Sequence, residues 1–430
     1  MARHLSISKM ILSSTIILLS SSAAAMADAK QEAKIDKKAL SSSYHQLHEN
    51  PELGKEEVKT AEFIRSKLKE YGYRDLLSVT AAPTTVIAIL DTGKSGTCIC
   101  FRSEMDARKC TEKTNLPFAS KSVGLMHNCG HDAHAAILLE TAHQLMLQKD
   151  SLKGKYVLLF QPAEECAGGA DEIVNDGILK RLGVAAIFAQ HSSPNLPVGF
   201  FNYSAGPVLA GSNNFTVKLS GLGGHAAQPH ERDDLSSLAA LLTLELERLP
   251  SRVADVIRFP TVCAVTNNSF SSTQANVAAD AVTLGGTIRA FYSMDEKLFR
   301  GKSFKELASQ LVSGLSSAYG VNSELDIRAS APVTVNDASI FKEISPALSA
   351  AGLKIEAQER GMFAEDFSYY TNSIPSAYFG LGISRDGRGS NMVHSAQFNI
   401  HEDCLEYGVR LFMVLAEKYS HLDLQAPDKP

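Results

Sequence analysis

Apolar side chains along the first 160 residues follow two different spacings. Ala61, Ile64, Leu68 and Tyr71 recur every three or four residues, which is the spacing of one face of a helix. Short continuous apolar runs, typical of buried strands, alternate with such segments. The pattern predicts strands over 86–90, 97–102 and 155–160 and a helix over 132–148. This alternation favours a parallel or mixed sheet that is covered by helices.

The middle of the chain follows another order. Strand-like segments are expected at 214–219, 262–265, 282–291 and 322–327, and helical segments at 235–249 and 304–315. The order β-α-β-β-α-β is the ferredoxin-like arrangement, a compact unit that can stand alone. Gly206-Pro207 and Ala331-Pro332 are possible hinges. We therefore predict an α/β protein with a split first domain, residues 28–206 and 330–430, and an inserted ferredoxin-like α+β domain, residues 207–329.

The composition excludes several classes of protein. The 430 residues include 42 basic and 47 acidic side chains, so the formal net charge is −5. Hydrophobic residues make up 44% of the chain, which is ordinary for a globular protein and argues against disorder. A mildly acidic chain without a long run of Lys or Arg is not expected to bind nucleic acid.

The N-terminal segment has the pattern of a secretory signal peptide. Arg3 and Lys9 precede an apolar run over 10–19, and small residues lead to Ala25-Met26-Ala27. The run is too short for a spanning helix of ~20 residues, so an uncleaved anchor is the less favoured alternative. We expect residues 1–27 to be removed and the mature protein to be periplasmic or secreted, without stable membrane insertion.

Potential metal ligands concentrate between two predicted elements. Cys129, His131 and His134 lie within six residues, with Gly130 between the first two. A tight turn at this glycine would aim a thiolate and an imidazole at one ion, and Asp132 would cap the helix that follows. A polar loop with unremarkable histidines is the alternative interpretation. The seven cysteines are too few and odd in number for a disulfide scaffold, and Cys129 differs from the others because histidines and an aspartate follow it closely.

Further candidates follow other predicted strands. Glu164 and Glu165 come directly after the strand at 155–160, where one carboxylate can bind a cation and the other can move protons. An exposed Glu-Glu pair in a solvated turn is the ordinary alternative. His191 follows an apolar run, and His394 lies in a polar loop. Together these side chains form a sulfur, nitrogen and oxygen set suited to zinc or manganese: Cys129, His131, Glu165, His191 and His394.

The chain resembles the peptidase M20 amidohydrolases, in the branch of hippurate hydrolases, aminoacylases and auxin–amino-acid conjugate hydrolases. The likeness runs from about His45 to Tyr419. Its motifs, in the family's order, are His48-Glu49-Asn50-Pro51-Glu52-Leu53-Gly54, the Cys129–His134 loop, Gln161-Pro162-Ala163-Glu164-Glu165, Gly224-His225-Ala226-Ala227-Gln228-Pro229-His230, Gly286-Thr287-Ile288-Arg289 and Ala364-Glu365-Asp366-Phe367.

The resemblance implies a catalytic domain with two divalent metal ions per subunit, zinc or manganese, and an inserted lid domain that forms a homodimer. It assigns the five ligands named above and makes Glu164 the general acid and base. It also implies that His225, Asn276 and Arg289 hold the substrate's carbonyl or carboxylate, with His225 reaching the partner subunit's site. The substrate class is then a small N-acyl amino acid, with dipeptides as the second choice.

One motif departs from the family pattern. Where the family usually reads Arg-Ala-Asp-Met-Asp-Ala-Leu, this chain has Arg102-Ser103-Glu104-Met105-Asp106-Ala107-Arg108. Asp106 is retained and is expected to assist catalysis as a carboxylate beside the metal ligands. Glu104 and Arg108 leave the chemistry intact but put the substrate preference in question.

The sequence therefore predicts metal-assisted hydrolysis of an amide bond in N-acyl amino acids. An exported dipeptidase or carboxypeptidase of the same fold, and a metal- or peptide-binding module without activity, are the alternatives. No G-x-S-x-G motif is present, so a serine hydrolase of that type does not compete.

Overall fold

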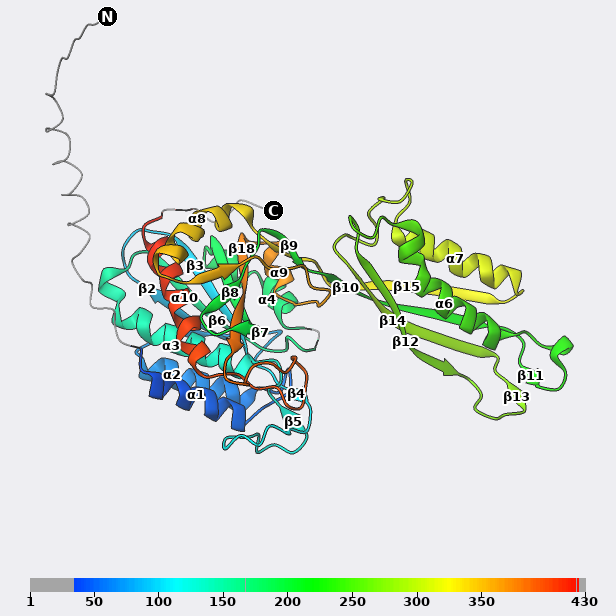
Figure 1. Cartoon of the computed structure of the whole chain (residues 1–430), viewed down its shortest axis with the longest axis horizontal. Helices are drawn as coiled ribbons and strands as arrows, with labels where there is room; N and C mark the ends of the chain where they lie inside the picture. Colours follow the sequence, from blue (N-terminus) through cyan, green and yellow to red (C-terminus); the bar gives the residue numbers. More distant parts are fainter. Residues whose placement is uncertain (1–34, 167, 423, 425–430) are drawn as a thin grey trace, which may run out of the picture. The chain divides into compact units, whose positions relative to one another are not determined.

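The computed structural model describes residues 35–166, 168–422 and 424, and the expected signal peptide lies outside them (Figure 1). Two regions with separate sheets make up the described chain. We call residues 36–209 and 332–422 the large-sheet region and residues 211–331 the insertion. Within the described residues, no helix has the length and apolar character needed to cross a membrane.

The large-sheet region contains an eight-stranded mixed sheet with the strand order β1-β2-β6-β3-β7-β18-β8-β17. Its strands are β1 (Leu76–Leu77), β2 (Val86–Asp91), β3 (Cys98–Glu104), β6 (Lys155–Gln161), β7 (Ala186–Pro197), β8 (Phe200–Asn202), β17 (Lys354–Glu356) and β18 (Ser376–Ser384). The four central strands β6, β3, β7 and β18 run parallel, whereas β2 and β8 pair antiparallel to their neighbours β6 and β18. The predicted mixed sheet is confirmed.

Short hairpin-like pairs and helices complete this region. The helices are α1 (Lys37–Glu49), α2 (Val58–Glu70), α3 (His131–Leu147), α4 (Ala170–Asp176), α5 (Ile178–Arg181), α8 (Ala338–Ala350), α9 (Ser368–Thr371) and α10 (Asp403–Ser420). The pairs are β4 (Arg108–Lys109) with β5 (Leu125–Met126), and β9 (Gly206–Leu209) with β16 (Thr334–Asn336).

Alternation along the central strands places apolar side chains on both faces of the large sheet. Cys100 and Ile187 belong to a buried cluster with residues of α4, α5 and α9. Phe101 and Phe188, one residue further along each strand, contact Phe412 and Tyr419 of α10. Helices therefore cover both faces of the sheet, and the ends of the strands are where functional side chains can be exposed.

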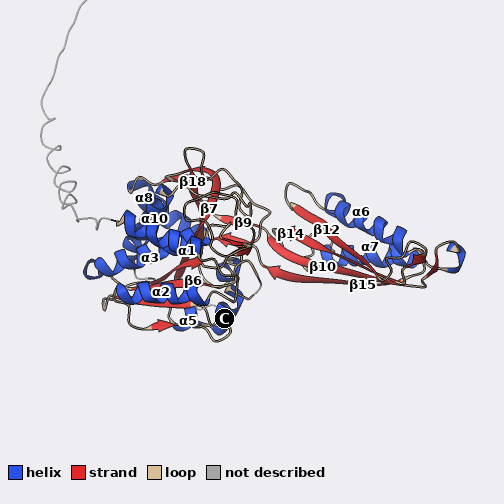
Figure 2. Cartoon of the chain, turned by 90° about the horizontal axis from the view of Figure 1, so that it is seen from below, coloured by secondary structure: helices blue, strands red, loops and turns tan. Residues whose placement is uncertain are grey.

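The insertion has the predicted β-α-β-β-α-β order, with a small antiparallel pair of two-residue strands, β11 and β13, added to it. Its elements are β10 (Gly211–Ser220), β11 (Gly224–His225), α6 (Leu235–Val253), β12 (Thr261–Phe270), β13 (Val277–Ala278), β14 (Ala281–Ala290), α7 (Phe304–Ala318) and β15 (Asn322–Ala331). The four long strands form one antiparallel sheet in the order β12-β14-β10-β15. Figure 2 shows α6 and α7 on the same side of it.

The insertion's core is apolar and lies between its sheet and its helices. Strand residues such as Val217 and Leu284 pack in one buried cluster with Leu238 and Leu242 of α6 and Val312 of α7. The sheet begins and ends a few residues beyond the expected boundaries 207 and 329. That the insertion folds as an independent domain stays a prediction.

Candidate metal centre

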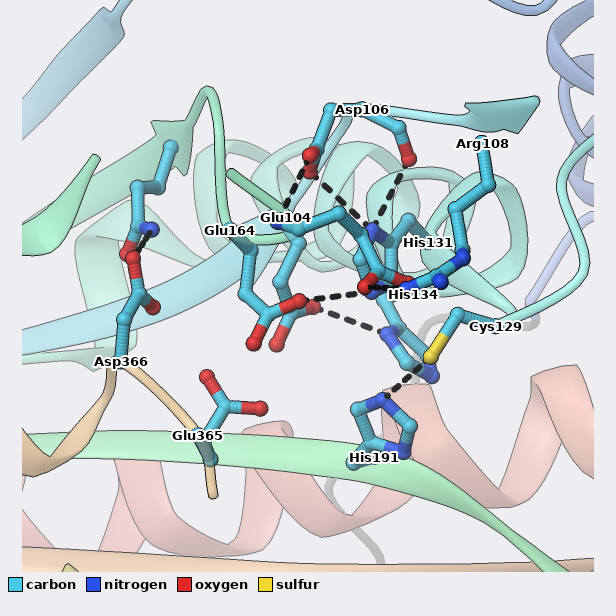
Figure 3. A network of polar contacts seen from close by, with 12 residues as sticks. Glu104, Asp106, Arg108, Cys129, His131, His134, Glu164, His191, Glu365 and Asp366 are labelled. Atoms are coloured by element: carbon cyan, nitrogen blue, oxygen red, sulfur yellow. Dashed lines mark hydrogen bonds and ion pairs between the residues drawn. The ribbon is translucent and has the colours of Figure 1, made fainter. Parts of the chain in front are cut away.

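The predicted catalytic and metal-ligating residues gather where the parallel strands end, and Figure 3 labels Asp106, Cys129, His131, Glu164 and His191 among them. The carboxyl ends of parallel strands share one edge of a sheet, which is where α/β proteins bind their ligands. Strand β3 leads to Asp106 and Arg108, and β6 leads to Glu164 and Glu165. His191 lies within β7 at the same edge. His394 follows β18, and Cys129 and His131 stand at the start of α3.

The turn before α3 depends on a glycine. Gly130 has a φ of 95° and is the N-terminal cap of the helix. A Cβ atom there would lie 2.4 Å from Ser192 Oγ, so both conformation and space require glycine. The prediction that Asp132 caps α3 is therefore wrong. Asp132 instead lies inside the first turn, where its carboxylate accepts from the Ala133 amide and pairs with His48 Nδ1 at 2.6 Å.

Two overlapping triads of donor atoms lie in the site. Cys129, His131 and His191 form one, and Cys129, Glu165 and His394 form the other, with the ligand atoms of each triad within 4.8 Å of one another. Cys129 is common to both, and its Sγ lies 3.3 Å from His191 Nε2. Thiolate, imidazole and carboxylate are the donors that zinc uses in proteins, and the shared cysteine suits two neighbouring ions. We call these the His131 triad and the His394 triad.

The orientation of His131 fits a metal ligand. Its Nδ1 lies 2.9 Å from the Asp106 carbonyl oxygen and 3.2 Å from Asp106 Oδ1, so the ring is held by the contact typical of metal-binding histidines. Its Nε2 is buried and has no hydrogen-bond partner among the described residues. A buried ring nitrogen without a partner is costly, and a bound cation would satisfy it. Asp106 also accepts a hydrogen bond from the Glu165 amide at 2.9 Å.

Burial affects the thiol and the second histidine of the His131 triad. It raises the pKa of the Cys129 thiol to about 12 and lowers the pKa of His191 to about 4. Without an ion the low-dielectric site therefore favours the neutral forms of both groups. A bound divalent cation deprotonates a coordinating thiol and needs a neutral imidazole, so His191 is already in the required form.

Glu164 lies in a cluster of carboxylates. One oxygen each of Glu164, Glu365 and Asp366 lie within 4.8 Å of one another, and Glu164 Oε2 is 3.8 Å from His131 Nε2. Burial raises the pKa of Glu164 well above its ordinary value, and the charges of Glu365 and Asp366 raise it further. The residue before it, Ala163, has a φ of 57°, an uncommon conformation for a residue with a side chain. The surroundings of Glu164 thus favour its protonated form more than water does.

Glu165 has the opposite character. Burial raises its pKa, but the hydrogen bond with His394 and the charges of His131, His394 and Arg108 outweigh burial and lower the pKa to about 2. Glu165 Oε1 lies 3.2 Å from His394 Nε2, and Arg108 forms an ion pair with Glu165 Oε2. The two adjacent glutamates therefore differ in charge, as the predicted division between a ligand and a proton carrier requires.

A buried arginine holds the carboxylates beside Glu164. The guanidinium of Arg102 is fully buried and forms ion pairs with Glu104, Glu365 and Asp366. Glu104 also reaches His134 Nδ1 at 2.8 Å, while His134 Nε2 lies 3.0 Å from Ser192 Oγ. Both ring nitrogens of His134 are thus engaged by protein groups.

Sequence reasoning did not give Arg102, Glu365 and Asp366 a role in the site. The signal available was an adjacent acidic pair, Glu365-Asp366, directly before an aromatic residue. Charges next to a buried position need a partner, and the buried Arg102 supplies it from a strand more than 250 residues away.

The three predicted substrate-binding residues are placed differently. Arg289 of β14 lines a cavity of about 1080 Å³ together with Cys129, Glu164, His191 and His394. His225 and Asn276 are not among the residues that line this cavity. They are exposed and lie next to each other, since the Ala226 amide donates to the Asn276 carbonyl at 2.9 Å. Their role, and those of the other site residues, stay predictions.

Metal-dependent hydrolases place an acid/base carboxylate beside a cluster of metal ligands, and Glu164 stands in that relation to the two triads. Together with the relatives below, this arrangement defines the chain as a metal-dependent hydrolase of amide bonds. Its residues 100–418 match the model of peptidase family M20/M25/M40, and the chain belongs to that family. The resemblance noted in the sequence is confirmed.

Curated relatives cover most of the chain. An IAA-amino acid hydrolase from Arabidopsis thaliana (ILR1-like 4) is 37% identical over 392 residues, which are 88% of this chain and 85% of the relative. Thermostable carboxypeptidase 2 from Saccharolobus solfataricus is 33% identical and covers 87% of this chain and 94% of its own. An N-acetyl-L-cysteine deacetylase from Bacillus subtilis (strain 168) is 34% identical, and the match covers 84% of this chain and 83% of the relative.

A solved structure shares the fold. A dinuclear metal-binding peptidase of the M20 family from Bacillus subtilis superposes with a TM-score of 0.76 at 30% identity, and the match covers 88% of this chain and 97% of that chain. This likeness includes both the large-sheet region and the insertion, and confirms the predicted fold class.

Proposed function

We propose that this protein cleaves the amide bond of N-acyl amino acids, releasing a carboxylic acid and a free amino acid. Two of the relatives carry names for this chemistry, an IAA-amino acid hydrolase and an N-acetyl-L-cysteine deacetylase. The observation that carries the proposal is the position of Arg289. This half-buried guanidinium lines the same cavity as Glu164 and both triads, so one substrate can meet a cation and the hydrolytic residues together.

We propose two divalent ions per subunit, zinc or manganese, held by the His131 triad and the His394 triad. When bound, such ions polarise the scissile carbonyl and acidify a water molecule. Asp106 holds His131 in the orientation that directs Nε2 away from its carboxylate and into the site. The donor set accommodates either metal, and the solved relative is described as dinuclear.

Glu164 moves the proton. In its charged form it accepts a proton from the attacking water at a carboxylate oxygen, and then donates that proton to the nitrogen of the leaving amine. Burial and the neighbouring Glu365 and Asp366 favour the protonated form that the second transfer needs. Positive charge at the triads favours the carboxylate that the first transfer needs.

Arg289 recognises the substrate's carboxylate. Its Nε donates to Thr287 Oγ1 at 3.1 Å, which holds the guanidinium, and its terminal nitrogens have no partner among the described residues. An arginine suits a carboxylate because it forms two parallel hydrogen bonds. A carboxypeptidase or dipeptidase activity is the second candidate, since a dipeptide also ends in a carboxylate and one relative is named a carboxypeptidase.

Matched substrates test this proposal. Release of the amine is measured for an N-benzoyl amino acid, for the same compound with its carboxylate converted to an amide, and for a dipeptide. We expect the first to be cleaved best, and Arg289→Gln to raise its KM by ~10–100-fold, the scale of a lost charged hydrogen bond. Arg328→Gln removes a guanidinium that is exposed on β15 and is the control. Equal KM values for wild type and Arg289→Gln would contradict the assignment, and faster cleavage of dipeptides would favour the second candidate.

We also propose that the insertion forms a homodimer in which His225 and Asn276 complete the partner's site. In support, both are exposed and adjacent and lie outside the cavity of their own chain. Mixing Glu164→Gln with His225→Ala under subunit exchange would then restore activity toward half the wild-type value. Mixed dimers without recovered activity would contradict this role.

Export to the periplasm or medium remains our proposal from the N-terminal pattern. The intact mass of the protein, purified after expression with its N-terminal segment in a host that secretes proteins, tests it. A mass that still includes residues 1–27 would contradict cleavage.

A further inference from the structure

Arg108 occupies a position where the family usually has leucine, and the structure places it against metal ligands. It belongs to β4, whose partner β5 leads directly into the Cys129 loop, with Arg108 paired to Met126. The guanidinium forms an ion pair with Glu165 Oε2, and its Nη1 lies 3.4 Å from His394 Nε2. Both partners belong to the His394 triad, and the guanidinium therefore sits at one triad specifically.

The atoms that Arg108 engages are those that an ion would need. A cation would bind His394 through Nε2, and the Nη1 atom of Arg108 lies 3.4 Å from that same nitrogen. A cation binds Glu165 through its carboxylate, and Arg108 already neutralises that charge. The guanidinium is a permanent cation that cannot release a proton to make room.

The His131 triad is in a different state. Its His131 Nε2 is buried and has no hydrogen-bond partner among the described residues, where Arg108 forms no hydrogen bond or ion pair with His131 or His191. The two triads share Cys129, and ligand atoms of His131 and Glu165 also lie within 4.8 Å of each other. The guanidinium of Arg108 thus contacts ligands of the His394 triad, but neither histidine of the His131 triad.

We propose that Arg108 competes with the cation at the His394 triad, so that the two ions bind with unequal affinity and the His131 triad fills first. This inference rests on the two-ion proposal above. An ion that binds Glu165 and His394 would lie next to the guanidinium, and two neighbouring cations repel strongly. The ion therefore has to displace the guanidinium. The Arg108 side chain is 36% exposed, so it has solvent to move into.

The competition has a measurable size. Groups that contact metal ligands commonly change metal affinity by 10–100-fold, and a charged competitor belongs in that range. We therefore expect Arg108→Leu to tighten the second Mn²⁺ dissociation constant by ~10-fold or more and to leave the first nearly unchanged. Arg108→Gln removes the charge but keeps a polar side chain of similar reach, and it should act in the same direction.

The experiment is a titration of the metal-free protein with Mn²⁺. Calorimetry gives both dissociation constants, and the electron paramagnetic resonance spectrum distinguishes isolated ions from coupled pairs, so no activity is needed. Lys109→Leu is the matched control, because it removes a positive charge from the next residue of β4, where the side chain is exposed. Circular dichroism checks that each variant is folded. If Arg108→Leu does not fold, Arg108→Gln alone tests the inference.

The outcomes separate this inference from the proposed function. A weak second site in wild type and Lys109→Leu, tightened in both Arg108 variants, supports the competition. Two sites of equal affinity in wild type, or a second constant that neither Arg108 variant changes, overturns it and leaves the proposed function standing. Absence of Mn²⁺ and Zn²⁺ binding in every variant contradicts the proposed function and this inference with it.

Discussion

The large-sheet region and the insertion bury very different kinds of side chain. At the strand ends of the large-sheet region, Arg102, Glu104, Asp106, His131 and Glu365 are each at most 4% exposed. The insertion's core is an apolar cluster, and its few buried polar residues are uncharged: Ser212, Asn213, Ser303 and Ser316. Burying charge is costly unless each group has a partner, whereas burying apolar surface stabilises directly.

This difference separates what each region contributes. The large-sheet region supplies both triads and Glu164, and its charges support one another across distant segments. The insertion supplies Arg289 to the cavity from a scaffold whose core is apolar. Changes at the strand ends should therefore alter chemistry and its pH dependence, and changes in the insertion's core should alter stability alone.

The largest effect is expected at Glu164. Glu164→Gln keeps the size and polarity of the side chain but cannot accept the proton, so kcat should fall by ~10²–10⁴-fold, the scale of a lost general acid and base. Metal content, measured by elemental analysis, should stay at the wild-type value because Glu165 is intact. An unchanged kcat at equal metal content would remove Glu164 from the mechanism.

The next effect concerns stability and belongs to the insertion. Leu242 of α6 is fully buried, so Leu242→Ala should reduce the free energy of unfolding by ~2–5 kcal/mol. Leu244, two residues along the same helix, is 59% exposed, and Leu244→Ala should change stability by less than ~0.5 kcal/mol. Urea denaturation measures both. Loss of bound Mn²⁺ in the folded Leu242→Ala variant would contradict the claim that the insertion's core affects stability but not the metal site.

The smallest effect is a pH dependence of stability in the large-sheet region. Burial lowers the pKa of His48, but hydrogen bonds to Asp132 and Glu112 outweigh it and raise the pKa to about 9. A folded pKa above the unfolded value of ~6.5 stabilises fully below pH ~6.5, and that stabilisation is lost as the pH rises through about 9. Compared with His48→Gln, metal-free wild type should be more stable by ~1–3 kcal/mol near pH 6 and gain nothing above pH 9.5.

Urea midpoints at pH 6, 7.5 and 9.5 for the two proteins measure this prediction. Glu112 sets the lower end of the pH range in which this ion pair stabilises the fold. Burial raises its pKa, but its hydrogen bonds to His48, Thr114 and Ser120 lower it to about 2, so its contribution is lost as the pH falls from ~4.5 toward 2. A difference between wild type and His48→Gln that does not change with pH would show that the pair is structural but not charged.

The fold was predictable because its elements follow local periodicity. The order of strands and helices in the insertion and the helix near 132–148 matched the structure. The cap of α3 was not predictable in the same way. Aspartate is a good cap in general, but here the left-handed Gly130 is the cap of the helix. Asp132 lies in the first turn and pairs with the distant His48 instead.

The site was predictable where ligand types cluster in sequence. The Cys129 loop and the Glu164-Glu165 pair carry their chemistry in adjacent residues. Partners that meet only in the fold left no local signal, as with Arg102 and Glu365, which are 263 residues apart. Arg108 was recognisable as a departure from the family pattern, but its contact with Glu165 and His394 depends on how strand β4 and two loops meet.

The central claim is that the two triads hold metal ions that drive amide hydrolysis. The most direct measurement is amine release from an N-acyl amino acid by purified protein, before and after chelation and after reloading with Zn²⁺ or Mn²⁺, with metal content determined for each sample. We predict that chelation removes the metal and abolishes release, and that reloading restores both in proportion. Hydrolysis that continues at the original rate in metal-free protein would contradict the account.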